Sequence, residues 1–274
     1  MNTETIGMIG AGNMASSQIH GLIAKGISPG SLYAADPDQL KLDLLAEKCG
    51  INIGSNQTLA ATVDVLVLAV KPQVLRGVCR QLDILARPEL PLVISVAAGI
   101  PLGNLEQWLG DNLAITRCMP NTPALIGKGA SGLFANPQTS VQQRELAESI
   151  MEAVGIAVWV DNEQAIDAVT ALSGSGPAYY FLFLETMQAA ARELGLSESV
   201  AKQLGLQTAH GAIELALHSK EDVAELRRQV TSPGGTTEQA LLAFENGGLR
   251  ALVHKALSAA NQRSKELARE YGES

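Results

Sequence analysis

The sequence predicts an α/β protein, in which a Rossmann-type, doubly wound sheet is followed by an all-helical domain. Three observations predict this order. Short, β-rich apolar runs alternate with helical stretches over the first 161 residues, a glycine-rich turn follows the first run, and strand signals stop after about residue 162. Such alternation is typical of a parallel sheet covered on both faces.

Six runs in the first part have the composition of strands: Thr5–Ile9, Leu32–Asp36, Val65–Val70, Leu92–Val96, Ala114–Met119 and Ala157–Asp161. The run around Val63–Val70 is almost continuously apolar, which predicts a strand buried on both faces. Helices are expected between the strands, for example over Met14–Lys25, which Gly26 ends, and over Gln39–Lys48, which Asp36-Pro37 opens.

The second part has only helical patterns: Glu163–Leu172, Pro177–Gly195, Ser197–His218, Glu221–Val230, Thr237–Asn246 and Gly248–Tyr271. Ser197 is placed as a helix N-cap, and Gly195 and Gly247 stand where helices end. Pro177–Ala191 is apolar around most of its circumference, so we expect a partner subunit or its own domain to bury it. The expected domains are 1–161, which binds a dinucleotide, and 162–274, for substrate and oligomerisation.

Composition excludes several classes of protein. The 274 residues include 20 Lys+Arg and 28 Asp+Glu, for a net charge of −8, and 46% are hydrophobic. Disorder is excluded, and an acidic chain without a basic block is a poor ligand for nucleic acids or anionic membranes. We expect no membrane partner, since no apolar run reaches the roughly 18 residues of a membrane span, and no signal peptide, since no basic segment opens the chain.

Cysteine and histidine usage argues against metal and disulfide sites. Cys49, Cys79 and Cys118 are odd in number, widely spaced and outside any CxxC pair, and the four histidines have no HxxxH spacing. We therefore expect no bound metal, and a globular protein of a reducing compartment, the cytoplasm.

The glycine-rich turn has the form GxGxxA and joins the first predicted strand to a helix. Gly10 permits the tight turn, Gly12 lets a pyrophosphate approach the backbone, and Ala15 lets the helix pack closely on the strand. An ordinary strand-to-helix turn is the alternative, but the strand–turn–helix context favours dinucleotide binding.

Asp36 ends the second predicted strand, where an acidic residue bonds the ribose 2′-hydroxyl of NAD. Its alternative role is that of a helix N-cap ahead of Pro37. No arginine follows closely to hold a 2′-phosphate, so these residues favour NAD or a mixed preference.

Three further segments follow strands, at the edge where open α/β sheets bind ligands. Val70-Lys71-Pro72 offers a lysine that could contact the cofactor. The alternative is a solvent-exposed loop lysine without a ligand. Ser95–Gly99 offers a floor of small residues for a nicotinamide. Arg117–Pro123 forms a rigid loop in which Asn121 and Thr122 supply polar groups.

Two glycine-rich loops interrupt the helical part: Leu172–Ala178 and Thr231–Thr237. Both place small hydroxyls and bare amides before a helix, a ready site for a carboxylate. Routine interhelical turns are the alternative, but paired glycines beside three threonines favour anion binding for the second loop.

The motifs AVKPQ, RCMPNTPA, LSGSGPAYYF and SPGGTTEQAL, in this order and over essentially the whole chain, resemble the pyrroline-5-carboxylate reductase family. The resemblance implies NADPH, or also NADH, as cofactor and homo-oligomers, dimers or rings of dimers, built through the helical domain. By motif, the resemblance assigns to the cofactor Gly10, Ala11, Gly12, Asn13, Met14, Asn56, Ala69, Val70, Lys71, Ala97 and Ala98. Their positions at the same edge of the sheet add Asp36, Pro72 and Asn121 as cofactor candidates. The resemblance assigns Thr236 and Thr237 to the substrate carboxylate, and we add as substrate candidates Glu163, Ser175, Ser232 and Gly235. Asp36 departs from what a strict NADPH enzyme prefers.

The implied reaction is hydride transfer to C5 of a cyclic imino acid, which gives L-proline. No histidine or loop carboxylate is placed to act as general acid, and a proton from water or a hydroxyl suffices for an imine. We therefore name no essential general acid. Thr237 has the hydroxyl that we favour for holding the substrate or assisting protonation of the imine. The Ser175 hydroxyl and the Glu163 carboxylate are weaker candidates.

Two other functions stay open. A β-hydroxyacid dehydrogenase has the same two-domain plan and a helical lysine as acid, but Lys202, Lys220, Lys255 and Lys265 do not begin a glycine-flanked helix. A non-catalytic NAD(P)H-sensing module would bind cofactor without turnover.

Overall fold

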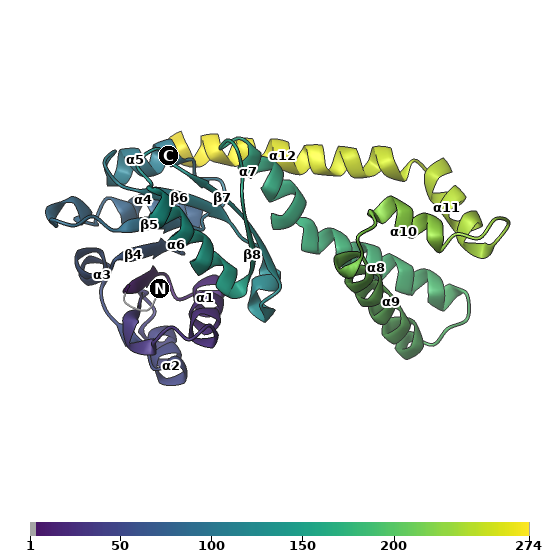
Figure 1. Cartoon of the computed structure of the whole chain (residues 1–274), viewed down its shortest axis with the longest axis horizontal. Coiled ribbons are helices and arrows are strands. Elements are labelled where there is room, and N and C mark those ends of the chain that lie inside the picture. Colours follow the sequence, from purple (N-terminus) through teal and green to yellow (C-terminus); the bar gives the residue numbers. More distant parts are fainter. Residues whose placement is uncertain (1–3, 274) are drawn as a thin grey trace. The chain divides into compact units, whose positions relative to one another are not determined.

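The structure is a computed structural model that describes residues 4–273. The chain forms two compact units (Figure 1). The first contains the residues up to Ser175 together with those from Ala259 on, and the second contains Gly176–Ser258. This division differs from the expected boundary at residue 162, because α7 (Ala165–Val169) packs on the sheet. A Cβ built on Gly132 would lie only 2.6 Å from a methyl group of Val169.

The first unit is built on one eight-stranded sheet. Its strands are β1 (Ile6–Ile9), β2 (Leu32–Ala35), β3 (Asn52–Ile53), β4 (Val65–Leu68), β5 (Leu92–Ser95), β6 (Ile115–Met119), β7 (Gly129–Ala135) and β8 (Gly155–Trp159). The strand order is β3-β2-β1-β4-β5-β6-β7-β8, and each neighbouring pair is parallel except β6 and β7. The six predicted strands are confirmed, with ends shifted by at most two residues.

Strands β3 and β7 were not predicted. The sequence of β7, GASGLFA, is rich in residues with low strand propensity, so it lacks the β-branched signature by which strands are recognised. Its direction follows from the preceding short connection, in which Gly127 has a φ of +69° and reverses the chain.

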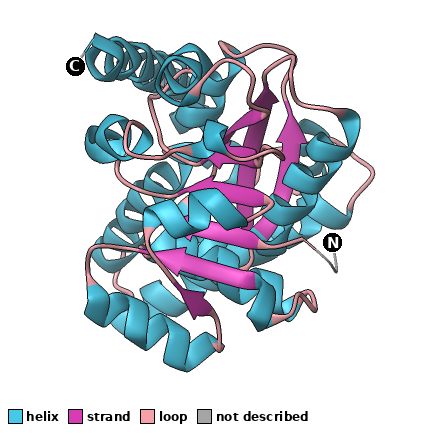
Figure 2. Cartoon of the chain, turned by 90° about the vertical axis from the view of Figure 1, so that its left-hand side faces the viewer, coloured by secondary structure: helices cyan, strands magenta, loops and turns pink. Residues whose placement is uncertain are grey.

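The central strands of the sheet are buried on both faces, as predicted, whereas β8 exposes Ile156 and Val158 on one face. Val65 and Val67 join one apolar cluster, whereas Leu66 and Leu68 join the other, because successive side chains of a strand point to opposite faces. Figure 2 shows the strands enclosed by helices.

The helices of this unit are α1 (Asn13–Ala24), α2 (Gln39–Cys49), α3 (Asn56–Thr62), α4 (Pro72–Cys79), α5 (Leu102–Leu109), α6 (Val141–Met151) and α7, which continues into a π-helical turn, Thr170–Gly174. The second unit contains α8 (Gly176–Glu193), α9 (Glu198–His218), α10 (Val223–Gln229), α11 (Thr236–Asn246) and the start of α12 (Leu249–Glu273). The predicted cap is confirmed, because the Ser197 hydroxyl accepts a hydrogen bond from the Val200 amide. Within residues 4–273, no helix is both long and apolar enough to cross a membrane.

The sheet topology determines where a ligand can bind. Strand β1 lies between β2 and β4, so the strand order reverses on either side of it. In open α/β sheets, ligands bind beyond the carboxyl ends of the strands at this switch point. The loops after β1, β2, β4 and β5 therefore converge on one edge, which we call the coenzyme edge.

Candidate active site

The glycine turn at the coenzyme edge requires glycine at its first position. Gly10 has a φ of +103°, and a Cβ there would lie 2.6 Å from the carbonyl oxygen of Ala69 in the neighbouring strand's loop. The Gly10 amide donates a 2.7 Å hydrogen bond to the Ala35 carbonyl, so the turn is tied to β2 as well. Only a residue without a side chain fits between these two strands.

Gly12 has a different role, because its backbone is ordinary (φ −74°). It is the N-cap of α1, where no side chain of the described residues caps the first turn. A Cβ on Gly12 would have no atom of the described chain within 4 Å, so it would project into open space. Free amides, a helix N-terminus and open space suit a pyrophosphate, so the turn fits a dinucleotide cofactor.

Asp36 holds the glycine turn. Its Oδ2 accepts a 2.7 Å hydrogen bond from the Ala11 amide, and its Oδ1 accepts one of 2.9 Å from the Asp38 amide. The alternative role of Asp36 as helix N-cap is wrong. Helix α2 begins at Gln39, and its cap is Asp38, whose carboxylate accepts a hydrogen bond from the Lys41 amide.

Two adjoining cavities lie over the coenzyme edge. The larger, of about 650 Å³, is lined by the glycine turn, by Asp36 and by Asn56 at the start of α3. The smaller, of about 340 Å³, is lined by Met14, Ala97 and Ala98. Ala69, Val70 and Lys71 line both, and Pro72 and Asn121 line the smaller. Ala11 and Asn13 line neither. Most cofactor residues expected from sequence are therefore brought together.

Asn121 has its side chain engaged within the protein. Its Oδ1 accepts a 2.9 Å hydrogen bond from the Ala130 amide, and its Nδ2 donates one of 3.0 Å to the Ser173 carbonyl. The residue is 9% exposed. It ties the π-helical turn, which ends at Gly174 beside the smaller cavity, to strand β7. Ser175 follows, and its amide closes this turn on the Thr170 carbonyl.

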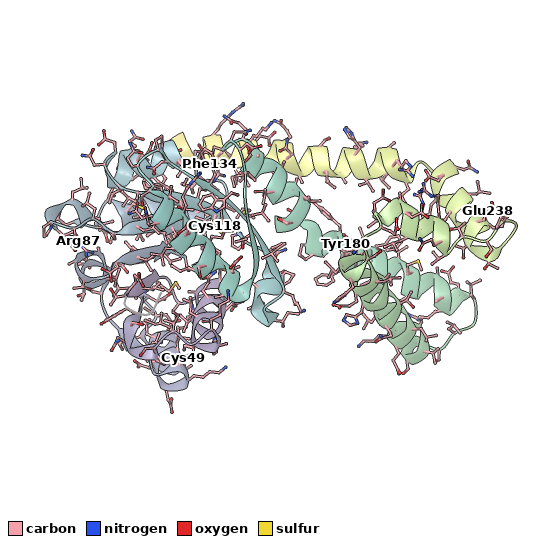
Figure 3. All side chains as sticks on the ribbon, in the orientation of Figure 1. Cys49, Arg87, Cys118, Phe134, Tyr180 and Glu238 are labelled. Atoms are coloured by element: carbon pink, nitrogen blue, oxygen red, sulfur yellow. The ribbon has the colours of Figure 1, made fainter. Side chains whose placement is uncertain are left out.

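The SPGGTT loop presents its polar groups to solvent. Gly234 adopts a φ of +73°, and its amide donates to the Glu238 carboxylate, labelled in Figure 3. Gly235 is the N-cap of α11, and no side chain within residues 4–273 caps that helix. Ser232, Thr236 and Thr237 are exposed. The first-turn amides and these hydroxyls form an anion-binding arrangement on the helical unit.

The part of the chain that the structure describes offers no metal site, because no three His, Cys, Asp or Glu side chains gather to hold an ion. The cysteines are also poor nucleophiles. Burial raises the pKa of the Cys79 and Cys118 thiols to about 12, so both stay protonated at neutral pH.

Residues 163–267 match the family profile described as pyrroline-5-carboxylate reductase dimerisation, and residues 5–99 match the one described as NADP oxidoreductase, coenzyme F420-dependent. A pyrroline-5-carboxylate reductase of Pseudomonas aeruginosa is 51% identical over 274 residues, all of both chains. This chain belongs to the pyrroline-5-carboxylate reductase family.

Solved structures of the family agree with the fold. A pyrroline-5-carboxylate reductase from Coxiella burnetii matches with a TM-score of 0.94 and 47% identity, over 97% of this chain and 99% of that one. The Plasmodium falciparum enzyme, solved with NADP bound, matches with a TM-score of 0.85 and 31% identity, over 98% and 99% of the two chains. The predicted Rossmann and helical architecture is confirmed.

As a pyrroline-5-carboxylate reductase family member, the protein is an NAD(P)H-dependent oxidoreductase acting on a C=N bond, which confirms the activity expected from sequence. The profile over residues 163–267 also supports a homo-oligomer. Accordingly, α8 and α9 carry large exposed apolar side chains, including Tyr180 (65% exposed, Figure 3), Phe181 and Leu217. Within α8 only Gly176 is buried, so the helix's large apolar side chains stay exposed on the helical unit.

In this reductase, Glu163 forms an ion pair with the buried Arg117, which sequence reasoning missed. Its Oε1 accepts hydrogen bonds from Arg117 (3.0 Å) and from the Leu102 amide (2.7 Å). The Arg117 side chain is only 4% exposed. A buried guanidinium requires a paired carboxylate, and 46 positions separate the two residues, so no local pattern could reveal the pair.

Proposed function

We propose that the protein reduces the cyclic imine of pyrroline-5-carboxylate to L-proline at the coenzyme edge, with NADPH as the preferred cofactor. The observation that carries this proposal is the pair of adjoining cavities that share Ala69–Lys71. One has the glycine turn for a pyrophosphate, and the other has a floor of small residues. Together they match the two ends of a dinucleotide.

The chain's own residues would hold the cofactor in two sections. The first-turn amides of α1 bind the pyrophosphate, and Lys71 adds a positive charge between the cavities. Ala97 and Ala98 are small enough for a planar ring to lie on them. Bound NADPH supplies the hydride that reduces the imine.

Lys41 is our candidate for the 2′-phosphate of NADPH. It lines the larger cavity with Asp36 and Asn56, and its Nζ lies 3.6 Å from the Asp38 carboxylate. Both oxygens of Asp36 already accept backbone hydrogen bonds, which offset part of its negative charge. A lysine beside this ribose end makes a 2′-phosphate acceptable despite Asp36.

The SPGGTT loop would bind the substrate carboxylate. Thr236 and Thr237 offer hydroxyls and first-turn amides, and Ser232 and Gly235 complete the loop. Thr237 is also our candidate to assist protonation of the imine nitrogen, with Ser175 as the second hydroxyl. We assign Glu163 to holding Arg117 rather than to the substrate, because its Oε1 is engaged. Orientation of the two reactants is then the main catalytic contribution.

Assembly and location are part of this proposal. The exposed apolar faces of α8 and α9 pair between copies, as dimers or rings of dimers. The free thiols of Cys49, Cys79 and Cys118 suit the reducing cytoplasm.

The decisive experiment follows the absorbance of reduced cofactor when pyrroline-5-carboxylate is added, with NADPH and NADH in separate series. We expect turnover with both and a lower KM for NADPH. Cofactor binding without oxidation would instead indicate a sensing module. Reduction of NADP⁺ by hydroxyacids would indicate the dehydrogenase alternative.

A further inference from the structure

The end of α12 belongs to the sheet unit rather than to the helical unit in which α12 begins. It is anchored there by Ser264, whose hydroxyl donates a 2.7 Å hydrogen bond to the Asp167 carboxylate in α7; both residues are buried. Asn104 of α5 donates to the Gly272 carbonyl, and Figure 1 shows the C-terminus beside α5. The final turns of α12 are therefore fixed against the sheet unit.

Tyr271 in this segment contacts the first of two neighbouring loops, those after β4 and β5, that contribute to the lining of the smaller cavity. Its hydroxyl accepts a 2.9 Å hydrogen bond from Nε2 of Gln73. Gln73 follows Lys71 and Pro72 directly, and both line the smaller cavity. A side chain 198 positions further along the chain thus holds the start of α4, where the β4 loop ends.

The same residue packs against the second loop. Gly99 follows Ala97 and Ala98, is buried and has a φ of +71°. A Cβ on Gly99 would lie 3.2 Å from Cβ of Leu267 and 3.4 Å from the Tyr271 ring. Tyr271 also joins the apolar cluster on that face of the sheet. The β5 loop therefore rests directly on the last turns of α12.

We infer that Tyr271 is a positioning residue for the nicotinamide end of the cofactor site. It lies outside the residues that line either cavity, and it contacts two of the loops that line the smaller one, those after β4 and β5. This role rests on the proposed function, in which the nicotinamide lies on Ala97 and Ala98. A small displacement of either loop would change the orientation of the ring toward the imine.

The adenosine end has a separate support. Asp36 fixes the glycine turn through the Ala11 amide, and Asn56 belongs to α3. None of the contacts described for α12 reaches these residues. Loss of Tyr271 should therefore weaken binding of the nicotinamide half and leave the adenosine half unchanged.

The test compares two ligands on the full-length protein. NADPH contains the nicotinamide, whereas 2′,5′-ADP contains only the adenosine half with its 2′-phosphate. Dissociation constants would be measured by calorimetry for wild type, Tyr271→Ala and Tyr271→Phe. For Tyr271→Ala we expect NADPH affinity to fall about fivefold, the usual effect of losing one hydrogen bond and its ring contacts, with 2′,5′-ADP affinity unchanged.

Arg269→Ala is the matched control, since Arg269 is exposed in the same turn. It should leave both affinities unchanged. Tyr271→Phe keeps the ring against Gly99 and loses only the bond to Gln73, so its effect on NADPH should be smaller and equally selective. Tyr271→Phe also keeps the test possible if Tyr271→Ala fails to fold.

Two results would overturn the inference: wild-type affinity for NADPH in both Tyr271 variants, or an equal loss of both ligands, which marks general destabilisation. A wild-type protein that fails to bind NADPH would instead overturn the proposed function, and with it this role. Steady-state kinetics add a second readout, because the KM for NADPH should rise in Tyr271→Ala while the KM for the imine stays constant.

Discussion

The carboxylate of Asp36 accepts a 2.7 Å hydrogen bond from the backbone amide of Ala11, in the middle of the glycine turn. An acidic residue in this position is commonly a ribose ligand. In this protein it also sets the shape of the loop that receives the pyrophosphate. The two roles can be separated by substitution.

Asp36→Asn keeps a hydrogen-bond acceptor for Ala11 and removes the negative charge. We expect affinity for NADPH relative to NADH to rise about fivefold, since about 1 kcal/mol of repulsion with the 2′-phosphate is relieved. Asp36→Ala should weaken both cofactors, because two amides lose their acceptor. Fluorescence titration measures both. An unchanged NADPH-to-NADH ratio in Asp36→Asn would leave the residue with the loop role alone.

Lys41→Ala should lower affinity for NADPH about tenfold and leave NADH unaffected, because a charge-assisted bond to the 2′-phosphate is lost. Lys48→Ala is the control, as this lysine lies at the other end of α2. Equal losses for NADPH and NADH, or a Lys48 effect of the same size, would remove Lys41 from the 2′-phosphate site.

The two glycines of the turn should respond differently to substitution. Gly12→Val should abolish binding of either cofactor and leave thermal stability nearly unchanged, because the side chain projects into open space at an allowed φ. Gly10→Ala should cost about 2 kcal/mol of stability, since its φ is +103° and its Cβ meets the Ala69 carbonyl. Calorimetry with and without NADPH compares them. Retained cofactor binding in Gly12→Val contradicts the assignment of the turn.

Thr237→Ala should raise the KM for the imine about tenfold through the lost bond to the carboxylate, with cofactor affinity unchanged. Thr231→Ala is a suitable control in the same loop, because the Thr231 hydroxyl already donates to the Arg227 carbonyl at 2.6 Å. Initial-rate kinetics distinguish them. If the KM is unchanged in Thr237→Ala, the residue does not contact the substrate.

Glu163→Gln should destabilise the protein by about 2 kcal/mol, because it leaves the buried Arg117 guanidinium without a negative counter-charge. The KM for the imine, measured below the unfolding transition, should not change. Denaturant unfolding gives the first quantity and kinetics the second. A raised KM at unchanged stability would restore Glu163 to the substrate site.

Much of the cofactor site was predictable because its signals are local. The turn from Gly10 to Met14 and the run before Lys71 each combine an apolar strand with a breaker residue, and topology alone brings the ends of parallel strands together. The residues of the coenzyme edge could therefore be predicted from short local motifs, without knowledge of contacts between distant segments.

The remaining features depend on contacts between distant residues. Arg117 and Glu163 carry no pattern that pairs them, and β7 has too many glycines to be recognised as a strand. Helical periodicity predicted α12 but could not show that Ser264 and Tyr271 pack on the sheet unit. The choice between a substrate and a structural role for Glu163 likewise required its partner.

The helical unit is inserted between two pieces of the sheet unit, since the chain leaves after Ser175 and returns at Ala259. During synthesis, the first 175 residues emerge from the ribosome long before the segment with Ser264 and Tyr271. Until then Asp167 has no hydroxyl partner, and the loop at Gly99 has no helix beneath it. We expect the nascent sheet to form early, and its coenzyme edge to be completed only after the segment with Ser264 and Tyr271 has emerged.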